Sequence, residues 1–436
     1  RVHVAARAPS ELDEQLTRGR FTVRDEAVRP AMTNRDAPTE RFRVGVYYWP
    51  GRTAMRWWTS FDAAEVRRDV DRIAAAGLDS VRIFLTWEDF QPTPDSVKRQ
   101  SLERLVDVAD LASDAGLALM PTLFTGHMSG VNWIPAWGLE PVEQEHRFRV
   151  IAGGSVSPRA LRSWFSDPEM MAAQVLLATE AARALAGHDA LWAWDLGNEN
   201  SNCVIPPDRT AGRVWLEQMT TAVRKADGGA AITIGLHMED LEEDRKIGPA
   251  EAGVFCDFLT MHGYPIYAPW ASGPTDEHLL GFLTKVTRWL GGGADVVFTE
   301  FGLPTSAASD DADPVAQSML VDEATASAFI DRALRDLRIA GATGAMLWCA
   351  NDYHPSIWGD PPLDQATHER SFGLWRRDGS PKPSVATVEA ACGRDVEQDP
   401  DEAAWIDIET DEFYTRGGSH LGRLYRRYRC EAPVTR

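Results

Sequence analysis

The feature that most constrains the fold is a rhythm repeated eight times along the chain: a short apolar run, a polar loop, and a stretch with helical periodicity. Strands that alternate with helices form a parallel sheet, and eight such units match a barrel that closes on itself. An open doubly wound sheet is the alternative, but it usually carries a glycine-rich phosphate loop after its first strand. Here residues 49–52 read WPGR. We therefore expect an α/β fold, a (β/α)8 TIM barrel with long βα loops. The eight expected strands are 44–48, 80–85, 117–123, 191–196, 231–236, 258–261, 295–299 and 344–348.

Capping residues indicate where the helices begin and end. Asp62, with Glu65 three residues later, has the spacing of a capping box, and Gly77 stands where glycine commonly follows a helix. A helix is therefore expected between Asp62 and Gly77. The segment 239–252 has the poorest helical pattern of the series. The other expected helices are 101–115, 167–186, 208–226, 275–290, 322–340 and 385–391.

The rhythm divides the chain into a short polar N-terminal extension (1–42), a catalytic barrel (43–392) and a short C-terminal tail (393–436). The tail is acidic at first and basic toward its end. It could be a capping appendage, an oligomer contact or a disordered end. The loops after the third and eighth strands are long, and loops beyond about 12–15 residues without regular structure are usually functional. If they wall off one end of a cleft, they favour exo attack or short oligosaccharides.

The formal net charge of −20 argues against nucleic acid and anionic membrane surfaces as partners, because both attract clustered Lys and Arg. No apolar run approaches the ~20 residues of a membrane span. No signal peptide is visible at Arg1, so we expect a cytoplasmic rather than a secreted protein. The five cysteines are odd in number and widely spaced, which predicts neither a zinc site nor a disulfide framework, with one disulfide left open. The oligomeric state is left open as well.

Two glutamates follow strands that are far apart in the chain. Glu199 follows the fourth expected strand and Glu300 the seventh. Catalytic groups of such barrels sit at the C-terminal ends of the strands, so the two side chains are expected to meet across one barrel mouth. A glutamate at a strand end is, by itself, more often a cap or a solvated loop residue. As a pair, the two suit retaining glycoside hydrolysis, which needs one acid/base and one nucleophile.

The residues around both glutamates resemble a known family. The segment 194–199, WDLGNE, looks like the strand-four signature of the retaining glycoside hydrolases of clan A, most like the family 5 cellulases and mannanases. The segment 298–302, FTEFG, resembles the strand-seven motif of the same clan. The resemblance covers residues 43–392. It implies Glu199 as acid/base, Glu300 as nucleophile and Asn198 as a contact to the sugar 2-hydroxyl.

Other positions match supporting residues of that clan. The segment 262–264, HGY, is similar to its His-x-Tyr, in which Tyr264 would contact the nucleophile and His262 would line the glycone pocket. Arg82 matches an arginine that supports the nucleophile, although a buried ion pair within the barrel would explain it equally well. Trp348 matches the tryptophan platform beneath the sugar, and by itself it would more often belong to the core.

The residues that would hold the rest of the substrate are less marked in the sequence. His127, after the third strand, is a candidate for the glycone-site histidine, and His237, after the fifth, is a second. Aromatic faces and carboxylates on the loop side could stack on sugars or bind their hydroxyls. These loop-side candidates are Tyr48, Trp49, Trp87, Glu88, Trp133, Trp137, Trp270, Asn351, Asp352 and Trp358.

Three functions follow from this pattern. The first is a retaining glycosidase that cleaves β-mannosides or β-glucosides in oligo- or polysaccharides. The second is a catalytically inactive barrel that only binds carbohydrate, against which the intact pair Glu199 and Glu300 speaks. The third is a metal-dependent hydrolase, which would need clustered His and acidic ligands at strand ends. The histidines here are scattered, so we expect neither a metal nor another cofactor.

Overall fold

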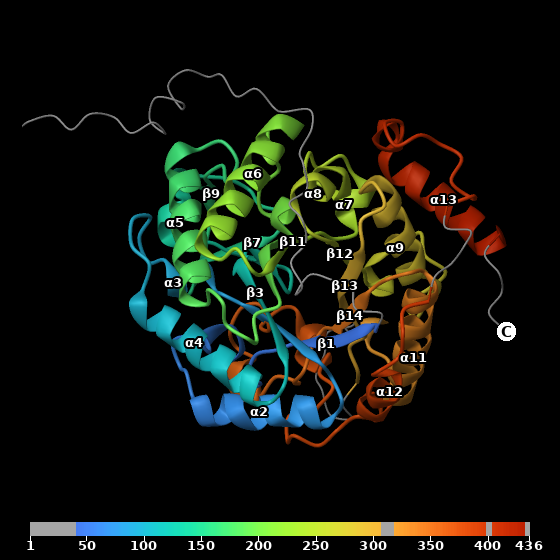
Figure 1. The fold of residues 1–436 in the computed structure, drawn as a ribbon, viewed down its shortest axis with the longest axis horizontal. Helices are drawn as coiled ribbons and strands as arrows, with labels where there is room; N and C mark the ends of the chain where they lie inside the picture. The colour runs from blue at the N-terminus through green and yellow to red at the C-terminus, as the bar shows by residue number, and fades with distance from the viewer. Residues whose placement is uncertain (1–40, 307–317, 398–402, 432–436) are drawn as a thin grey trace, which may run out of the picture.

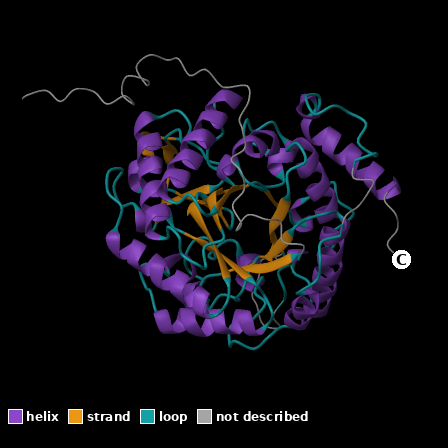
Figure 2. Cartoon of the chain, in the orientation of Figure 1, coloured by secondary structure: helices purple, strands orange, loops and turns teal. Residues whose placement is uncertain are grey.

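The computed structural model describes residues 41–306, 318–397 and 403–431. Eight parallel strands form one sheet in the order β11-β10-β3-β2-β1-β14-β13-β12. A bridge between His237 and His262, just beyond β11 and at the end of β12, closes the sheet into the ring of strands in Figure 2. The expected barrel is confirmed. Its strands are β1 (Arg43–Tyr47), β2 (Ser80–Phe84), β3 (Ala118–Phe124), β10 (Ala193–Asn198), β11 (Ala231–Gly235), β12 (Leu259–His262), β13 (Val296–Phe301) and β14 (Gly344–Leu347).

Helices surround this ring and bury one face each against it (Figure 1). The capping signals hold: Asp62 accepts hydrogen bonds from the backbone N–H groups of Ala64 and Glu65, which satisfies donors that the helix leaves unpaired. Asp167, Asp208 and Asp322 cap later helices in the same way. The outer helices are α2 (Ala63–Ala75), α4 (Arg99–Asp114), α5 (Pro168–Ala184), α6 (Arg209–Ala226), α8 (Pro249–Phe255), α9 (His278–Leu290), α11 (Glu323–Ile339) and α12 (Pro383–Ala391).

The segment between β3 and α5 is not the irregular loop that we expected. It forms a four-stranded sheet, β4-β5-β7-β8, and a two-stranded sheet, β6-β9. Tight turns with glycine at positive φ make this possible, such as Gly153 and Gly154 between β7 and β8. The segment therefore forms a folded wall beside the barrel mouth. Its strands are β4 (His127–Met128), β5 (Val131–Trp133), β6 (Leu139–Glu143), β7 (Arg149–Ala152), β8 (Ser155–Ser157) and β9 (Arg159–Leu161).

The described part of the C-terminal tail includes a helix, α13 (Gly417–Glu431), which lies against the outside of the barrel near α9 (Figure 1). Its buried Tyr425 packs edge-on against Phe282 of α9 and against Trp270. Of the choices that the sequence left open, the described part of the tail is thus a packed appendage.

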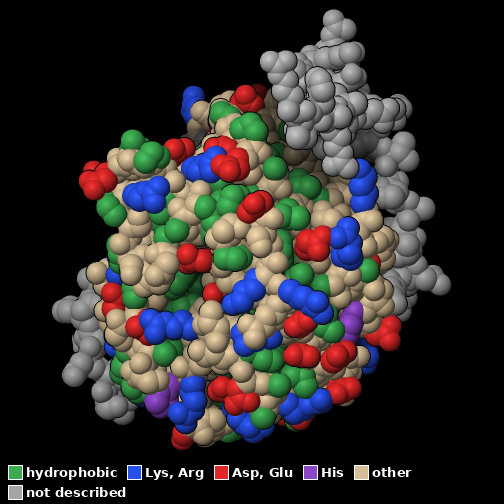
Figure 3. Space-filling view, turned by 90° about the vertical axis from the view of Figure 1, so that its left-hand side faces the viewer, with side chains coloured by type: hydrophobic (Ala, Val, Ile, Leu, Met, Phe, Trp, Pro, Cys, Tyr) green, Lys and Arg blue, Asp and Glu red, His purple; other side chains and the backbone are tan. Residues whose placement is uncertain are grey.

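The surface charges and the cysteines do not indicate a particular function. Acidic and basic side chains are interspersed over the face shown in Figure 3. All five cysteines are free. Within the described ranges, no helix is both long and apolar enough to cross a membrane.

Candidate active site

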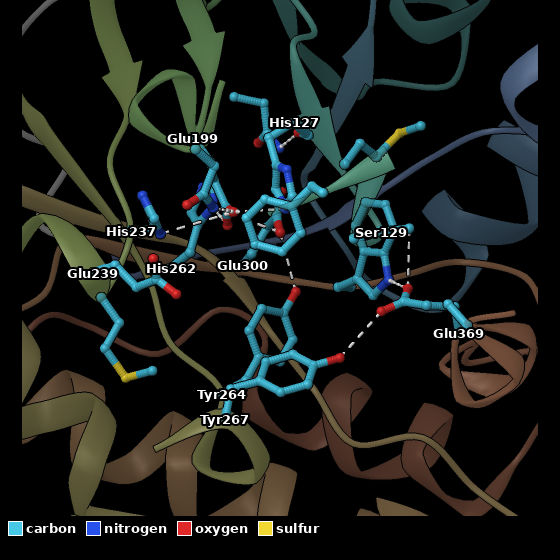
Figure 4. Close-up of a pocket in the computed structure, with 18 of the residues that line it drawn as sticks. His127, Ser129, Glu199, His237, Glu239, His262, Tyr264, Tyr267, Glu300 and Glu369 are labelled. Carbon is cyan, nitrogen blue, oxygen red and sulfur yellow. Dashed lines mark hydrogen bonds and ion pairs between the residues drawn. The ribbon is translucent and has the colours of Figure 1, made fainter. Parts of the chain in front are cut away.

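A pocket of about 420 Å³ opens at the C-terminal ends of the barrel strands (Figure 4). Its volume is in the range of small-molecule sites. Its lining comes from the segments that follow β3, β10, β11, β12 and β14, and from β13 itself. Both glutamates of the predicted pair, Glu199 and Glu300, face into it.

Glu199 stands directly after β10 at a sharp change of chain direction. Its backbone is left-handed, with φ 49° and ψ 43°, and a short 3-10 helix begins at the next residue. Its Oε1 lies 2.9 Å from Nδ1 of His262, and its Oε2 accepts a hydrogen bond of 3.2 Å from Nδ2 of Asn202. The side chain is 15% exposed, so the carboxyl can reach a ligand.

Glu300 lies within β13 and is buried. Its Oε1 accepts a 2.6 Å hydrogen bond from Arg82, and its Oε2 accepts one of 3.1 Å from the Tyr264 hydroxyl. Burial raises the pKa of Glu300 above the ordinary glutamate value, and the charge of Arg82 opposes that rise. Both direct partners donate hydrogen bonds, so they stabilise the carboxylate form.

Arg82 joins Glu300 to the barrel interior. It is fully buried and also donates to Asp195, at 2.6 Å, and to Oδ1 of Asn198, at 2.8 Å. Burial lowers the pKa of Arg82, but the carboxylates of Asp195 and Glu300 outweigh this effect and raise it. The ion-pair interpretation and the supporting role therefore describe the same contacts.

Three histidines surround the carboxyl of Glu199. Burial lowers the pKa of His262 to about 3, so its ring is neutral at ordinary pH. Nε2 of His127 and Nδ1 of His237 each lie 3.9 Å from Oε2 of Glu199. Burial lowers the pKa of both these rings as well.

The two carboxyl groups are close to each other. One oxygen of Glu199, one oxygen of Glu300 and a ring nitrogen of His262 all lie within 4.8 Å of one another. Three such groups could also hold a metal ion. However, the guanidinium of Arg82 already supplies a positive charge at 2.6 Å from Glu300, which disfavours a second cation there.

Comparisons with known proteins bear on this site. Neither a family model nor a curated protein sequence matches the chain. Several solved structures do. A glutamate-to-alanine variant of a GH5_18 protein from Streptomyces cattleya, in complex with Manβ1-4GlcNAc, has a TM-score of 0.70 and 20% identity over 88% of this chain and 92% of that one. A GH5_18 protein from Bifidobacterium longum subsp. infantis has a TM-score of 0.67 and 20% identity over 82% and 80% of the two chains.

These two matches show the fold. The exo-β-1,4-mannosidase Op5Man5 from Opitutaceae bacterium strain TAV5 is 27% identical, with a TM-score of 0.64, over 80% of this chain and 59% of that one. In fold, this chain therefore resembles the family 5-like glycoside hydrolases of clan A.

Further residues predicted from the sequence meet in the pocket. Trp348, at the end of β14, lines it, stacks on Tyr47 at 4.4 Å between ring centroids, and donates through Nε1 to Glu369. Asn198 also lines the pocket and donates through Nδ2 to the carbonyl of His127. The sequence motifs after β10, β12, β13 and β14 thus identify side chains that the fold brings together.

Four other predicted side chains lie outside the pocket, and each has a different partner. Trp49 is buried and donates to the Tyr353 hydroxyl. Trp87 is buried and donates to Gln91. Glu88 accepts hydrogen bonds from the backbone N–H of Gly153 in the wall between β7 and β8. Asp352 pairs with Lys382 in the interior, and burial raises the pKa of Asp352 to about 6.

The remaining aromatic and polar candidates also lie away from the pocket lining. Trp137, for example, donates to the carbonyl of Gln91, and Trp270 packs under α13. Many of the tryptophans fill the core, and of the tryptophans in the described ranges Trp348 alone lines the pocket. The others outside the pocket are Tyr48, Trp133, Asn351 and Trp358.

Sequence reasoning missed several pocket residues. Glu369 accepts hydrogen bonds from Trp348, from Ser129 at 3.1 Å and from the Tyr267 hydroxyl at 3.4 Å. The residue before it, His368, lies 2.6 Å from the Tyr267 hydroxyl. These residues come from loops and lack a motif. Arg147, in the wall segment before β7, and Glu239, which begins α7 (Glu239–Glu242), were missed for the same reason, and they form an ion pair across the pocket mouth at 2.6 Å.

Proposed function

We propose that this protein is a retaining exo-β-mannosidase that removes a terminal sugar from short β-linked oligosaccharides, with Glu300 as nucleophile and Glu199 as acid/base. The observation that carries the proposal is the paired carboxyls within 4.8 Å, each with different partners. Retaining pairs stand about 5–5.5 Å apart, whereas inverting pairs leave room for a water between them.

The partners of each carboxyl suit its proposed step. In the first step, Oε1 or Oε2 of Glu300 attacks the anomeric carbon, the glycosidic C–O bond breaks, and Glu199 gives its proton to the leaving oxygen. In the second step, Glu199 takes a proton from water as that water attacks the same carbon, and Glu300 leaves as a carboxylate. Arg82 and Tyr264 hold Glu300 ionised and oriented. Among the described residues, no positively charged side chain contacts Glu199, whereas Glu300 pairs with Arg82.

The shape of the pocket supports attack at a chain end. The bond from Ser129 to Glu369 links the wall segment after β3 to the loop after β14, and Tyr267 with His368 links the loop after β12 to the same loop. Figure 4 shows this closed end on the opposite side of the two glutamates from Glu239. An enclosed end leaves room for a terminal sugar rather than for a continuing chain.

The sugar is proposed from the comparisons. The Streptomyces cattleya structure holds Manβ1-4GlcNAc, and the Opitutaceae protein is an exo-β-1,4-mannosidase. Both support a terminal β-mannoside, with β-glucosides as the next choice. The two sugars differ in the direction of the 2-hydroxyl, and we propose that Asn198, which lines the pocket, contacts it.

The test is hydrolysis of aryl β-mannoside, β-glucoside, β-galactoside and β-xyloside by wild type and by Glu300→Gln. We expect activity on the mannoside, lost in Glu300→Gln, with the β-anomer as the first product in an NMR time course. Glu88→Gln is the matched control, since that carboxyl lies outside the pocket, and it should retain activity. Glu199→Ala should slow poor leaving groups far more than activated aryl glycosides.

An α-anomer as first product would refute the retaining mechanism. Full activity of Glu300→Gln would refute the nucleophile. If the wild type binds oligosaccharide but cleaves none of the panel or Manβ1-4GlcNAc, the chain is a carbohydrate-binding barrel.

A further inference from the structure

A row of buried polar side chains lies behind Glu199, and the reaction above does not use it. Asp240, in α7, accepts through Oδ1 a 2.6 Å hydrogen bond from the Ser201 hydroxyl and through Oδ2 a 3.0 Å bond from the backbone N–H of His237. Ser201 Oγ lies 2.9 Å from Nε2 of His237, whose Nδ1 faces Glu199 at 3.9 Å. Asp240, Ser201 and His237 are all buried.

The direction of these hydrogen bonds fixes which nitrogen of His237 carries the proton. With Asp240 ionised, the hydroxyl of Ser201 donates to it, so Ser201 Oγ accepts a bond from Nε2–H of His237. Nδ1 then presents a lone pair to Oε2 of Glu199. A lone pair disfavours a carboxylate nearby and favours the protonated acid.

His127 presents a second lone pair to the same oxygen. Its Nδ1 lies 2.7 Å from Oδ1 of Asn132, and Nδ2 of Asn132 donates to the carbonyl of Asn202. The amide orientation makes Oδ1 an acceptor, so Nδ1 of His127 carries the proton and Nε2 faces Glu199 without one. Two neutral rings thus favour the acid form of Glu199.

When Asp240 carries a proton, the hydrogen bonds of this row run in the opposite direction. Asp240 then donates to Ser201, Ser201 donates to Nε2 of His237, and Nδ1–H of His237 points at an ionised Glu199. Both arrangements hold the same number of protons, one having left Glu199 and one having reached Asp240. The first arrangement suits the acid step and the second suits the base step.

We propose that Asp240 is a positioning residue that sets the protonation state of Glu199 through Ser201 and His237. The proposal rests on the acid/base role proposed for Glu199. Figure 4 shows His237 beside Glu199 on the side toward Glu239, away from the closed end at Glu369. The row therefore lies on the side from which the leaving group departs.

The other groups near Asp240 leave this arrangement of hydrogen bonds unchanged. Burial raises the pKa of Asp240 to about 7, and Arg245 opposes this rise while Glu239 adds to it. The Tyr414 hydroxyl, from the tail, donates to the carbonyl oxygen of Asp240 rather than to its carboxyl. A carboxyl that titrates near neutral pH makes both arrangements accessible.

The groups facing Glu199 are constant between the two arrangements. They are His262, Asn202, Glu300 and the hydroxyl of Tyr264, with Cys203 nearby. Burial raises the pKa of Cys203 well above its ordinary value, so this thiol stays neutral.

Asp240→Asn tests the proposal because it locks one arrangement. The backbone N–H of His237 holds the new amide oxygen at the place of Oδ2, so the amide NH₂ takes the place of Oδ1 and donates to Ser201. Nδ1–H of His237 must then face Glu199 and favour its ionised form. Replacing an aspartate behind a catalytic histidine by asparagine selects the wrong tautomer by the same logic. We expect the alkaline limb of the kcat/KM profile to move down by about one pH unit, measured with a poor leaving group.

Ser201→Ala distinguishes an effect of the His237 tautomer from an effect of a general loss of structure. Nε2 of His237 lies 3.5 Å from Oδ1 of Asp240, so it can donate to the carboxylate directly once the hydroxyl is removed. The alkaline limb of Ser201→Ala should therefore stay within a few tenths of a unit of wild type. Glu251→Gln is the matched control, a buried carboxyl of neighbouring α8 that pairs with Arg209, and its profile should be unchanged.

The outcomes are distinct. An unmoved limb in folded Asp240→Asn, or an equal shift in Ser201→Ala, overturns the proposal and leaves the glycosidase intact. A wild type that cleaves no glycoside refutes the proposed function instead. If Asp240→Asn does not fold, the ring ¹⁵N shifts of His237 in the wild type decide: a change from the Nε2–H to the Nδ1–H tautomer below pH about 7 supports the row, and a single tautomer refutes it.

Discussion

Replacing Tyr264 by phenylalanine removes one hydroxyl from the site and leaves the ring in place. That hydroxyl donates 3.1 Å to Oε2 of Glu300, while Arg82 keeps its 2.6 Å bond to Oε1. The variant therefore loses one of two donors to the proposed nucleophile. Without it, the carboxylate is less stable, so the pKa of Glu300 rises further.

The magnitude follows from the kind of bond that is lost. A hydrogen bond to a charged group contributes about 1.5–3 kcal/mol. We take the lower end, about 1.5 kcal/mol, because the pocket can admit water to replace the hydroxyl. Since one pKa unit corresponds to about 1.4 kcal/mol, the pKa of Glu300 should rise by about one unit. The free-enzyme nucleophile must be ionised, so the acidic limb of kcat/KM moves to higher pH by that amount.

The assay is kcat/KM for an activated aryl β-mannoside across the acidic range, with thermal unfolding as a check on folding. Below the limb, the rate should fall about tenfold, as one pH unit requires. Tyr267→Phe is the control, because its hydroxyl contacts His368 and Glu369 rather than Glu300. Tyr267→Phe should change KM and leave the limb in place. An acidic limb that coincides in Tyr264→Phe and wild type would show that this hydroxyl does not act on the nucleophile.

Three further predictions concern the stability of the barrel and the position of Trp348. Lys382→Met leaves the buried carboxyl of Asp352 without its 2.7 Å partner, and we expect chemical denaturation to show a loss of about 3–5 kcal/mol; a loss below ~1 kcal/mol would contradict a buried pair. In Gly302→Ala, the new Cβ would stand 2.4 Å from the carbonyl oxygen of Trp348, so the platform must shift and kcat/KM should fall at least about tenfold in the same mannoside assay. Asp62→Ala removes a helix cap far from the pocket, so the free energy of unfolding should fall by about 1 kcal/mol with kcat unchanged, and a changed kcat would refute the separation of the two.

Much of the fold could be predicted because its signals are local. Asp62 and Gly77 delimit α2 through caps and turns that depend on a few neighbouring residues. Glu199 and Glu300 could be placed because parallel strands in a closed barrel bring their C-terminal ends to one mouth. Here a pattern within each short segment implied a contact across the whole chain.

The features that could not be predicted from the sequence depend on contacts between loops. Glu369 reaches the pocket only because the loop after β14 folds back over Trp348 and meets Ser129. Its sequence neighbourhood carries no period or motif. Conversely, Asp352 stands next to the eighth strand, but Lys382 draws it into the interior. The Gly153-Gly154 pair is a hairpin signal, and it lies in the segment expected to be an irregular loop.

The left-handed backbone of Glu199 also bears on how this protein could change. A residue with a Cβ costs roughly 1–2 kcal/mol in that conformation, whereas glycine adopts it readily. Glu199→Gly should therefore fold at least as stably as the wild type while losing the carboxyl. Selection for thermal robustness alone would thus drift toward a stable, inactive barrel. Thermostability screens of this protein need an activity readout at every round.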